Sequence, residues 1–210
     1  MNEIESVIRA YHSKIKESNI HRYASFDFCF EYFYYNRGNL MGENLQTSCC
    51  QLWAYLASWG MIVRGNELQG KSYVSLIGVI QYINKHTEYY DLTIEDTDYI
   101  KKMLDLYTGI DKALNLTKQK SRKTLITKII LGVYACCPAY DSNFCTTFGV
   151  STFTKLSRGD LEKIVNFYNK NKVVLDNILF YTHHFYKNDT HAKLLYTPAK
   201  LIDMYGFEKK

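Results

Sequence analysis

The sequence predicts an all-α protein, built as a single globular domain of several helices. Three observations favour this class. The 210 residues include only two prolines, apolar side chains recur at helical spacing along most of the chain, and no segment shows the period-two alternation typical of strands. Neither an internal repeat nor a linker rich in glycine, serine or proline interrupts the chain, so we expect one domain over residues 1–210.

Helical spacing in the first half of the chain predicts five helices. We place them at residues 2–17, 23–35, 47–63, 72–84 and from the Thr93–Asp96 capping box to about residue 114. Residues 36–42 contain two glycines and two asparagines and therefore predict a loop. Arg64-Gly65 interrupts the third helix, because glycine is unfavourable inside a helix.

A central buried helix is predicted at residues 124–136, because this segment is apolar on nearly every side. It follows a polar, basic connector at residues 117–123. Pro138 ends it, since proline lacks the backbone N–H group that a helix needs. A helix of this kind forms the middle of a core, and the other helices are expected to pack around it.

Capping residues mark the starts of the last three helices, and glycines mark two of the ends. The predicted starts are Asp141 or Ser142, Ser157 with Asp160, and Thr197-Pro198. The first and last of these helices end at Gly149 and Gly206. The middle helix runs through residues 169–171, and its extension to Phe185 is left open.

The cysteines and histidines do not form a metal-binding pattern. The six cysteines include two adjacent pairs but no Cys-x2-Cys spacing, which indicates reduced thiols in a cytoplasmic protein. His183 and His184 are adjacent and would point to different sides of a helix. Residues 1–18 are polar and amphipathic, unlike a signal peptide, and no apolar run reaches membrane-spanning length. We therefore expect no metal, no cofactor and no membrane association.

Positive charge is concentrated in one segment of the chain. The net charge is +5, and no acidic residue lies between Asp111 and Asp141. The six basic residues of this interval are Lys112, Lys118, Lys120, Arg122, Lys123 and Lys128. Positive charge beside a helix N-terminus suits phosphate. We therefore expect DNA to contact the last five of these residues together with Arg64; the alternative is a solvated loop. The 19 tyrosines are compatible with base stacking.

Asp141 is the candidate catalytic residue. It follows the end of the buried helix and begins the next one, so its carboxylate is held in one direction. Two alternatives remain open: the carboxylate caps the following helix, or it faces a cleft beside the basic segment. Tyr140 and Trp59 are the expected aromatic walls of such a substrate pocket. Asparagine caps a helix about as well as aspartate, so Asp141→Asn is expected to change stability little.

Several short motifs resemble those of a group of uncharacterised bacterial helical proteins. The motifs are Ser58-Trp-Gly-Met61 with Arg64-Gly65, Pro138-Ala-Tyr-Asp141, and Lys200-Leu-Ile-Asp-Met204. They are spread over most of the chain. This resemblance implies a shared helical fold but brings no assigned activity with it.

The order of elements around Lys128 also resembles the helix-hairpin-helix DNA glycosylases. Thr127-Lys128 is followed by an apolar helix and then by Pro138 and Asp141, although the Gly-x-Gly hairpin is absent and two residues separate the proline from the aspartate. The resemblance implies a glycosylase-like fold, base excision from a flipped nucleotide, and a catalytic role for Asp141. The alternative is a non-catalytic helical module that binds nucleic acid or another protein.

Overall fold

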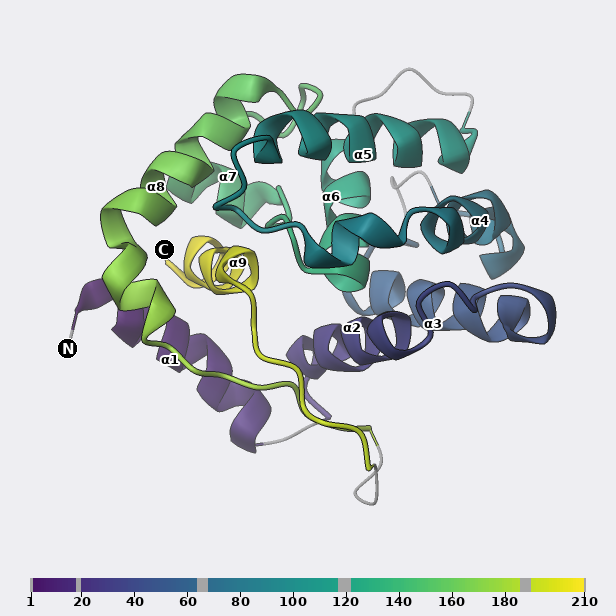
Figure 1. Ribbon diagram of the computed structural model, residues 1–210, viewed down its shortest axis with the longest axis horizontal. Helices are drawn as coiled ribbons and strands as arrows, with labels where there is room; N and C mark the ends of the chain where they lie inside the picture. The colour runs from purple at the N-terminus through teal and green to yellow at the C-terminus, as the bar shows by residue number, and fades with distance from the viewer. Residues whose placement is uncertain (1, 18–19, 64–67, 117–121, 186–189, 210) are drawn as a thin grey trace.

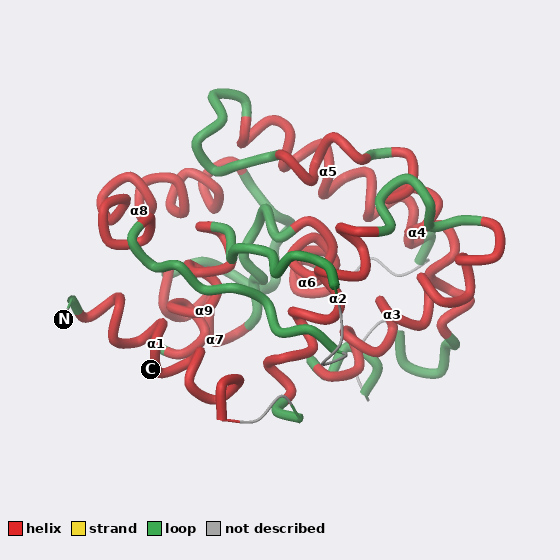
Figure 2. Tube along the Cα trace, turned by 60° about the horizontal axis from the view of Figure 1, so that its bottom comes forward, coloured by secondary structure: helices red, strands yellow, loops and turns green. Residues whose placement is uncertain are grey.

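The computed structural model describes residues 2–17, 20–63, 68–116, 122–185 and 190–209 (Figure 1). These residues form nine α-helices. The helices are α1 (Glu3–Glu17), α2 (Ser25–Tyr35), α3 (Leu45–Ser58), α4 (Ile77–Lys85), α5 (Tyr99–Leu114), α6 (Lys123–Tyr134), α7 (Ser142–Phe148), α8 (Arg158–Asp176) and α9 (Pro198–Glu208). No described segment is a strand (Figure 2). The all-α prediction is therefore confirmed.

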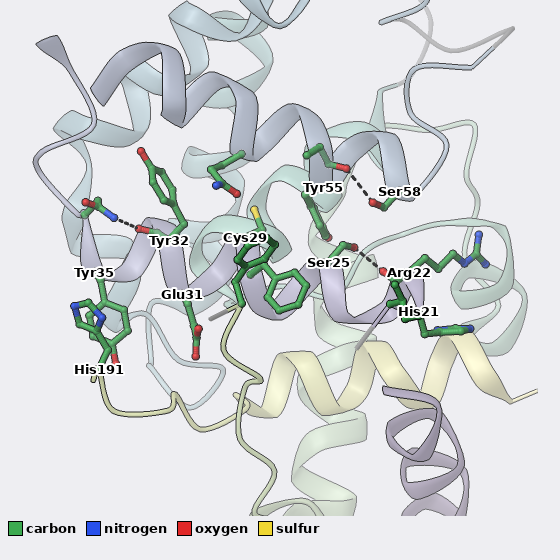
Figure 3. Close-up of a pocket in the computed structure, with 16 residues that line it drawn as sticks. His21, Arg22, Ser25, Cys29, Glu31, Tyr32, Tyr35, Tyr55, Ser58 and His191 are labelled. Carbon is green, nitrogen blue, oxygen red and sulfur yellow. Dashed lines mark hydrogen bonds between the residues drawn. The ribbon is translucent and has the colours of Figure 1, made fainter. Parts of the chain in front are cut away.

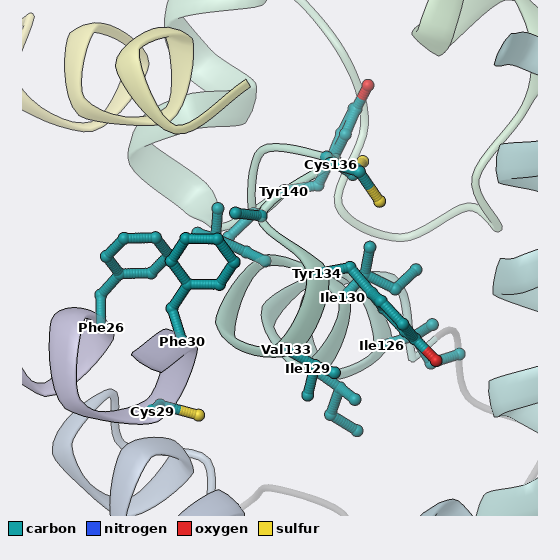
Figure 4. Close-up of a cluster of buried hydrophobic side chains, with 14 of the residues drawn as sticks. Phe26, Cys29, Phe30, Ile126, Ile129, Ile130, Val133, Tyr134, Cys136 and Tyr140 are labelled. Atoms are coloured by element: carbon teal, nitrogen blue, oxygen red, sulfur yellow. The ribbon is translucent and has the colours of Figure 1, made fainter. Parts of the chain in front are cut away.

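Helix α6 lies at the centre of the fold, as the sequence predicts. All but one of its residues are buried, and α2, α3 and α5 pack around it. Figure 4 shows Phe26 and Phe30 of α2 facing this helix. Gly132 lets α3 approach closely, because a Cβ atom there would lie 2.4 Å from the ring of Tyr55. Ala135 ends the helix in a left-handed conformation with φ of 53°.

Helix α9 forms the second centre of packing. It lies against α1, α7 and α8, and Thr197 caps it as expected by accepting a hydrogen bond from the Lys200 N–H at 3.1 Å. Gly206 does not end this helix, which corrects the sequence prediction. It lies inside α9, where a Cβ atom would come within 2.3 Å of the Phe144 ring. The glycine is needed for close packing and not for a helix end.

Helix α8 begins with the predicted capping box. The Asp160 N–H donates to Ser157 Oγ, and the Ser157 N–H donates to the Asp160 carboxylate. The helix ends at Asp176 and does not continue to Phe185. Residues 178–185 are extended instead, and Tyr181 forms an isolated antiparallel bridge with Leu195. Two buried carboxylates of α2 hold this segment, because His183 bonds Asp27 and Thr182 bonds Glu31.

Two helix starts differ from the sequence prediction. The Asp96 carboxylate accepts a hydrogen bond from the Thr93 N–H at 2.9 Å, but it closes a turn, and α5 begins only at Tyr99. Helix α4 is preceded by a 3-10 turn at Tyr73–Leu76, which shortens the helix predicted at 72–84. None of the helices that the structure describes is both long and apolar enough to span a membrane.

Candidate functional site

Asp141 lies where α6 and α7 meet, and its two carboxylate oxygens have different partners. Oδ1 accepts a hydrogen bond from the Phe144 N–H at 3.1 Å, which caps α7. Oδ2 accepts a hydrogen bond from the Lys128 ammonium group at 3.1 Å. Both alternatives left open by the sequence are therefore combined in one side chain: one oxygen caps a helix, and the other lies beside a cation at a cavity.

The chain segment before Asp141 is held by three side chains. Thr127 Oγ1 accepts a hydrogen bond from the Tyr140 N–H at 2.9 Å, and Thr124 donates to the Tyr140 carbonyl at 2.8 Å. The Asp203 carboxylate of α9 accepts from the Ala139 N–H at 3.0 Å. Because the two threonines and Lys128 share helix α6, these bonds determine where Asp141 lies relative to Lys128.

A cavity of about 430 Å³ opens beside this pair. Asp141 and Lys128 form part of its wall, together with Trp59, Arg22 and Phe207. The volume falls within the range of roughly 300–1,000 Å³ that is typical of small-molecule sites. The cavity is therefore large enough for a small ligand that carries a ring, and it presents both a carboxylate and two cations to that ligand.

Trp59 is the main aromatic surface of this cavity. The Lys128 ammonium nitrogen lies 4.4 Å from its ring centroid, and the Arg22 guanidinium carbon lies 5.2 Å from it. Tyr23 stacks on the indole with centroids 5.6 Å apart. The indole Nε1 is buried and has no hydrogen-bond partner among the described residues. A buried donor without a partner is unfavourable by roughly 1–3 kcal/mol, so most buried polar atoms in native proteins bond a protein group or an ordered water.

Three of the predicted phosphate-binding residues are largely buried and paired with carboxylates. The side chain of Arg122 is 10% exposed and bonds Asp111 at 2.7 Å. Lys123 is fully buried and contacts Asp160 at 2.9 Å, and Lys128 pairs with Asp141. Asp111 and Asp141 are the two residues that flank the stretch of sequence without acidic residues. The fold therefore neutralises much of the charge that the sequence concentrates there.

The other predicted site residues are placed as follows. Lys118, Lys120 and Arg64 lie outside the described residues. Trp59 lies in the wall of the cavity that Asp141 also lines. Tyr140 does not: it is completely buried, and its hydroxyl donates to the Asp160 carbonyl at 3.2 Å. The backbone of Tyr140 positions Asp141, whereas its ring fills the core.

Two features of the structure were missed by sequence reasoning. The first is Arg22, which lines the Asp141 cavity and also a second, larger cavity beside α2. The second is a pair of histidine–carboxylate contacts: His183 Nδ1 lies 2.9 Å from Asp27, and His184 Nδ1 lies 3.0 Å from Glu31. Acidic residues in the aromatic helix α2 were a usable signal, because buried carboxylates need partners.

The histidine–carboxylate contacts do not form a metal centre. Among the residues that the structure describes, no group of three or more histidine, cysteine, aspartate or glutamate side chains could hold a metal ion. Burial raises the pKa of the buried thiols Cys29, Cys136 and Cys137 above the usual value. These thiols therefore stay protonated at neutral pH, which makes them poor nucleophiles and poor metal ligands.

Comparison with known proteins gives no match: no family model, no curated protein and no solved structure is similar to this chain.

Proposed function

We propose that this protein binds DNA and hydrolyses the N-glycosidic bond of a nucleotide held in the Asp141 cavity. One observation carries the proposal. Asp141 Oδ2, the oxygen that does not cap α7, bonds the Lys128 ammonium group, and Asp141, Lys128 and Trp59 all line the same cavity. An aromatic wall suits a flipped base, and a fixed carboxylate can stabilise the positive charge that develops on the sugar.

The proposed reaction assigns one role to each group. The bond between sugar C1′ and the base nitrogen breaks, and its electron pair leaves with the base. The Asp141 carboxylate stabilises the positive charge that develops on the sugar. A water molecule then bonds to C1′ and gives its proton to the departing base, which leaves an abasic sugar. Trp59 forms the aromatic wall that the base lies beside, and Lys128, which lies over the Trp59 ring, is a positioning residue for the carboxylate.

Phosphate contact is proposed for Arg22, which stands at the edge of the cavity. The basic connector supplies two further candidates, Lys118 and Lys120. Arg122 and Lys123 are less suited to this role than the sequence indicates, because both are already paired with carboxylates. The resemblance to the helix-hairpin-helix DNA glycosylases supports the choice of DNA as the polymer.

A non-catalytic DNA-binding module is the second candidate function. The observation that favours it is that both oxygens of Asp141 already have protein partners, the Phe144 N–H and the Lys128 ammonium group. In that case the carboxylate secures the fold, and the cavity only binds. The two functions predict the same DNA contacts but differ in whether a base is released.

The amount of base released by the wild type and by Asp141→Asn distinguishes these two functions. The protein is incubated with single strands and duplexes that carry damaged or modified bases, and abasic sites are counted. We expect the wild type to release base and Asp141→Asn to lose activity by about 10²- to 10³-fold, because one well-placed electrostatic contact is removed. Absence of abasic sites with the wild type would leave the binding module as the function.

Asp160→Asn is the matched control. Asp160 also lies at a helix start and also pairs with a buried lysine of α6, at 2.9 Å from Lys123, but it is not part of the cavity wall. Both variants leave a buried ammonium group without its carboxylate, so both are expected to be less stable than the wild type. This corrects the expectation, made from the sequence, that Asp141→Asn changes stability little. Only Asp141→Asn should slow base release by about 10²- to 10³-fold.

A further inference from the structure

A second cavity, of about 770 Å³, lies between α2 and α3 (Figure 3). One face of each helix forms its walls. Helix α2 contributes Phe28, Tyr32 and Tyr35, and α3 contributes Gln51, Tyr55 and Ser58. These positions recur every three or four residues, so the cavity is a groove that follows both helices. At a rise of about 1.5 Å per residue, the α2 wall from Ser25 to Tyr35 is about 15 Å long.

The walls of this groove combine rings with hydrogen-bonding groups. Phe28 meets Phe185 edge to face with centroids 5.3 Å apart, and Phe185 is 63% exposed. Gln51 is half-buried, and its amide forms no side-chain hydrogen bond with any residue that the structure describes. Aromatic faces stack on bases, and a glutamine amide can pair with a base edge. The groove therefore suits a planar heteroaromatic ring.

Charge does not prevent an anionic polymer from entering the groove. Glu31 is the carboxylate in its wall, but its side chain is 8% exposed. Its oxygens are bonded to Thr182 and His184. Arg22 stands at the end of the groove, where it supplies a guanidinium group that can bind a phosphate.

The groove and the Asp141 cavity share one lining residue at this end. Arg22 lines both of them, and the consecutive residues Ser58 and Trp59 lie one in each wall. A base in the groove and a base beside Trp59 would therefore both lie next to Arg22. Two neighbouring nucleotides, joined by one phosphate, have this arrangement.

We propose that the groove binds the base next to the one in the Asp141 cavity, with Arg22 contacting the phosphate between them. The inference rests on the proposed function and names its substrate class. A base in the groove is removed from its stack and its pairing partner, as is the base in the Asp141 cavity. The substrate is therefore single-stranded DNA, because extruding two neighbouring bases from a duplex breaks two sets of base pairs.

Fluorescence anisotropy with labelled DNA tests this proposal. The probes are a single-stranded hexanucleotide, the same sequence within a hairpin duplex, and hexanucleotides in which one base is replaced by an abasic residue. We expect the wild type to bind the single strand at least tenfold more tightly than the duplex. Phe185→Ala and Gln51→Ala should each weaken binding of the single strand by about 5- to 150-fold, which is the effect of losing one base stack or one amide contact.

Two control variants match these substitutions. Tyr181→Ala removes a half-exposed ring from the same extended segment as Phe185, and Gln46→Ala removes an amide from the same helix as Gln51. Neither residue lines the groove, so both variants should bind like the wild type. An abasic residue at the position that enters the groove should weaken binding to the wild type but not weaken binding to Phe185→Ala further.

The possible results separate this inference from the proposed function. Equal binding by the groove variants and the wild type, or a preference for the duplex, would overturn the single-strand groove and leave base release to be judged by Asp141→Asn. Loss of binding in the groove variants without base release by the wild type would support the groove and reject the enzyme. No binding of either DNA form would reject both.

Discussion

Asp160→Asn is expected to destabilise the protein by about 3 kcal/mol, because the substitution leaves a buried positive charge without its carboxylate. Lys123 is fully buried. Its ammonium group donates to Asp160 at 2.9 Å, to the Ser151 carbonyl at 2.7 Å and to Thr154 Oγ1 at 3.3 Å. The two neutral acceptors remain after the substitution, but the compensating charge does not.

The magnitude follows from the burial of the pair. Removing one partner of a buried ion pair destabilises a protein by about 3–5 kcal/mol. Asparagine keeps an oxygen that can accept from Lys123 and from the Ser157 N–H of the capping box, so we take the lower end of this range. For a chain of this size, each kcal/mol shifts Tm by about 2–4 °C. A decrease of roughly 6–12 °C is therefore expected.

Urea unfolding followed by circular dichroism measures this effect, with an unchanged m-value as the sign that the folded state is intact. Lys123→Met removes the charge but keeps an unbranched chain of similar volume, so it should be less damaging than Asp160→Asn. The double variant should be more stable than the sum of the two changes indicates, because no unpaired charge remains. A loss of less than about 1 kcal/mol in Asp160→Asn would refute the reasoning.

The same pair has a pH signature. Burial acts to raise the pKa of Asp160, but hydrogen bonds from Lys123 and Ser157 outweigh it, so the pKa lies below its usual value of 3.8. A lowered carboxyl pKa stabilises the folded state above the unfolded pKa, and this stabilisation is lost as the pH falls through the folded value. Asp160→Asn should therefore reduce the loss of stability below about pH 4.

Two further predictions concern helices α1 and α9. Burial, and secondarily His183, lower the pKa of His12 from 6.5 to about 4, so stability should fall as the pH decreases across this interval. His12→Phe, which keeps the stack on Phe180, should reduce that slope in urea titrations at several pH values, and an unchanged slope would contradict it. Gly206→Ala should destabilise by about 1–3 kcal/mol through overpacking, since its Cβ would lie 2.3 Å from Phe144. Gly159→Ala, where the nearest atom is 4.0 Å away, is the control, and equal Tm values for the two variants would reject the packing argument.

Local signals in the sequence were sufficient to predict the buried helix α6 and the caps of α7, α8 and α9. These local signals did not predict contacts between side chains that are far apart in the sequence. Lys123 and its carboxylate partner are 37 residues apart, so the sequence indicates a surface cation where the fold contains a buried ion pair. The extended segment 178–185 has apolar positions compatible with a helix, but Asp27 and Glu31 of α2 bond it in another conformation.

The candidate site was predicted only in part, for the same reason. Asp141 stands out in the sequence because it begins a helix just after Pro138, and Trp59 because it belongs to the Ser58–Met61 motif; both are in the cavity wall. Lys128 was predicted as a phosphate ligand, but its position over Trp59 depends on how α3 packs against α6. Arg22 belongs to a short turn before α2 and has no distinctive neighbours in the sequence. Its role appears only when the two cavities are seen to share it.

The contact between α1 and α9 has a consequence for the order in which the protein folds. These helices form the most extensive helix pair in the described structure, yet nearly the whole chain separates them. Such a contact closes a very long loop, which is slow and entropically unfavourable until much else is in place. On a ribosome, the apolar surfaces of α1, α7 and α8 stay uncovered until residues 198–208 emerge. A chain interrupted before Pro198 would expose those surfaces and would be prone to aggregation and proteolysis.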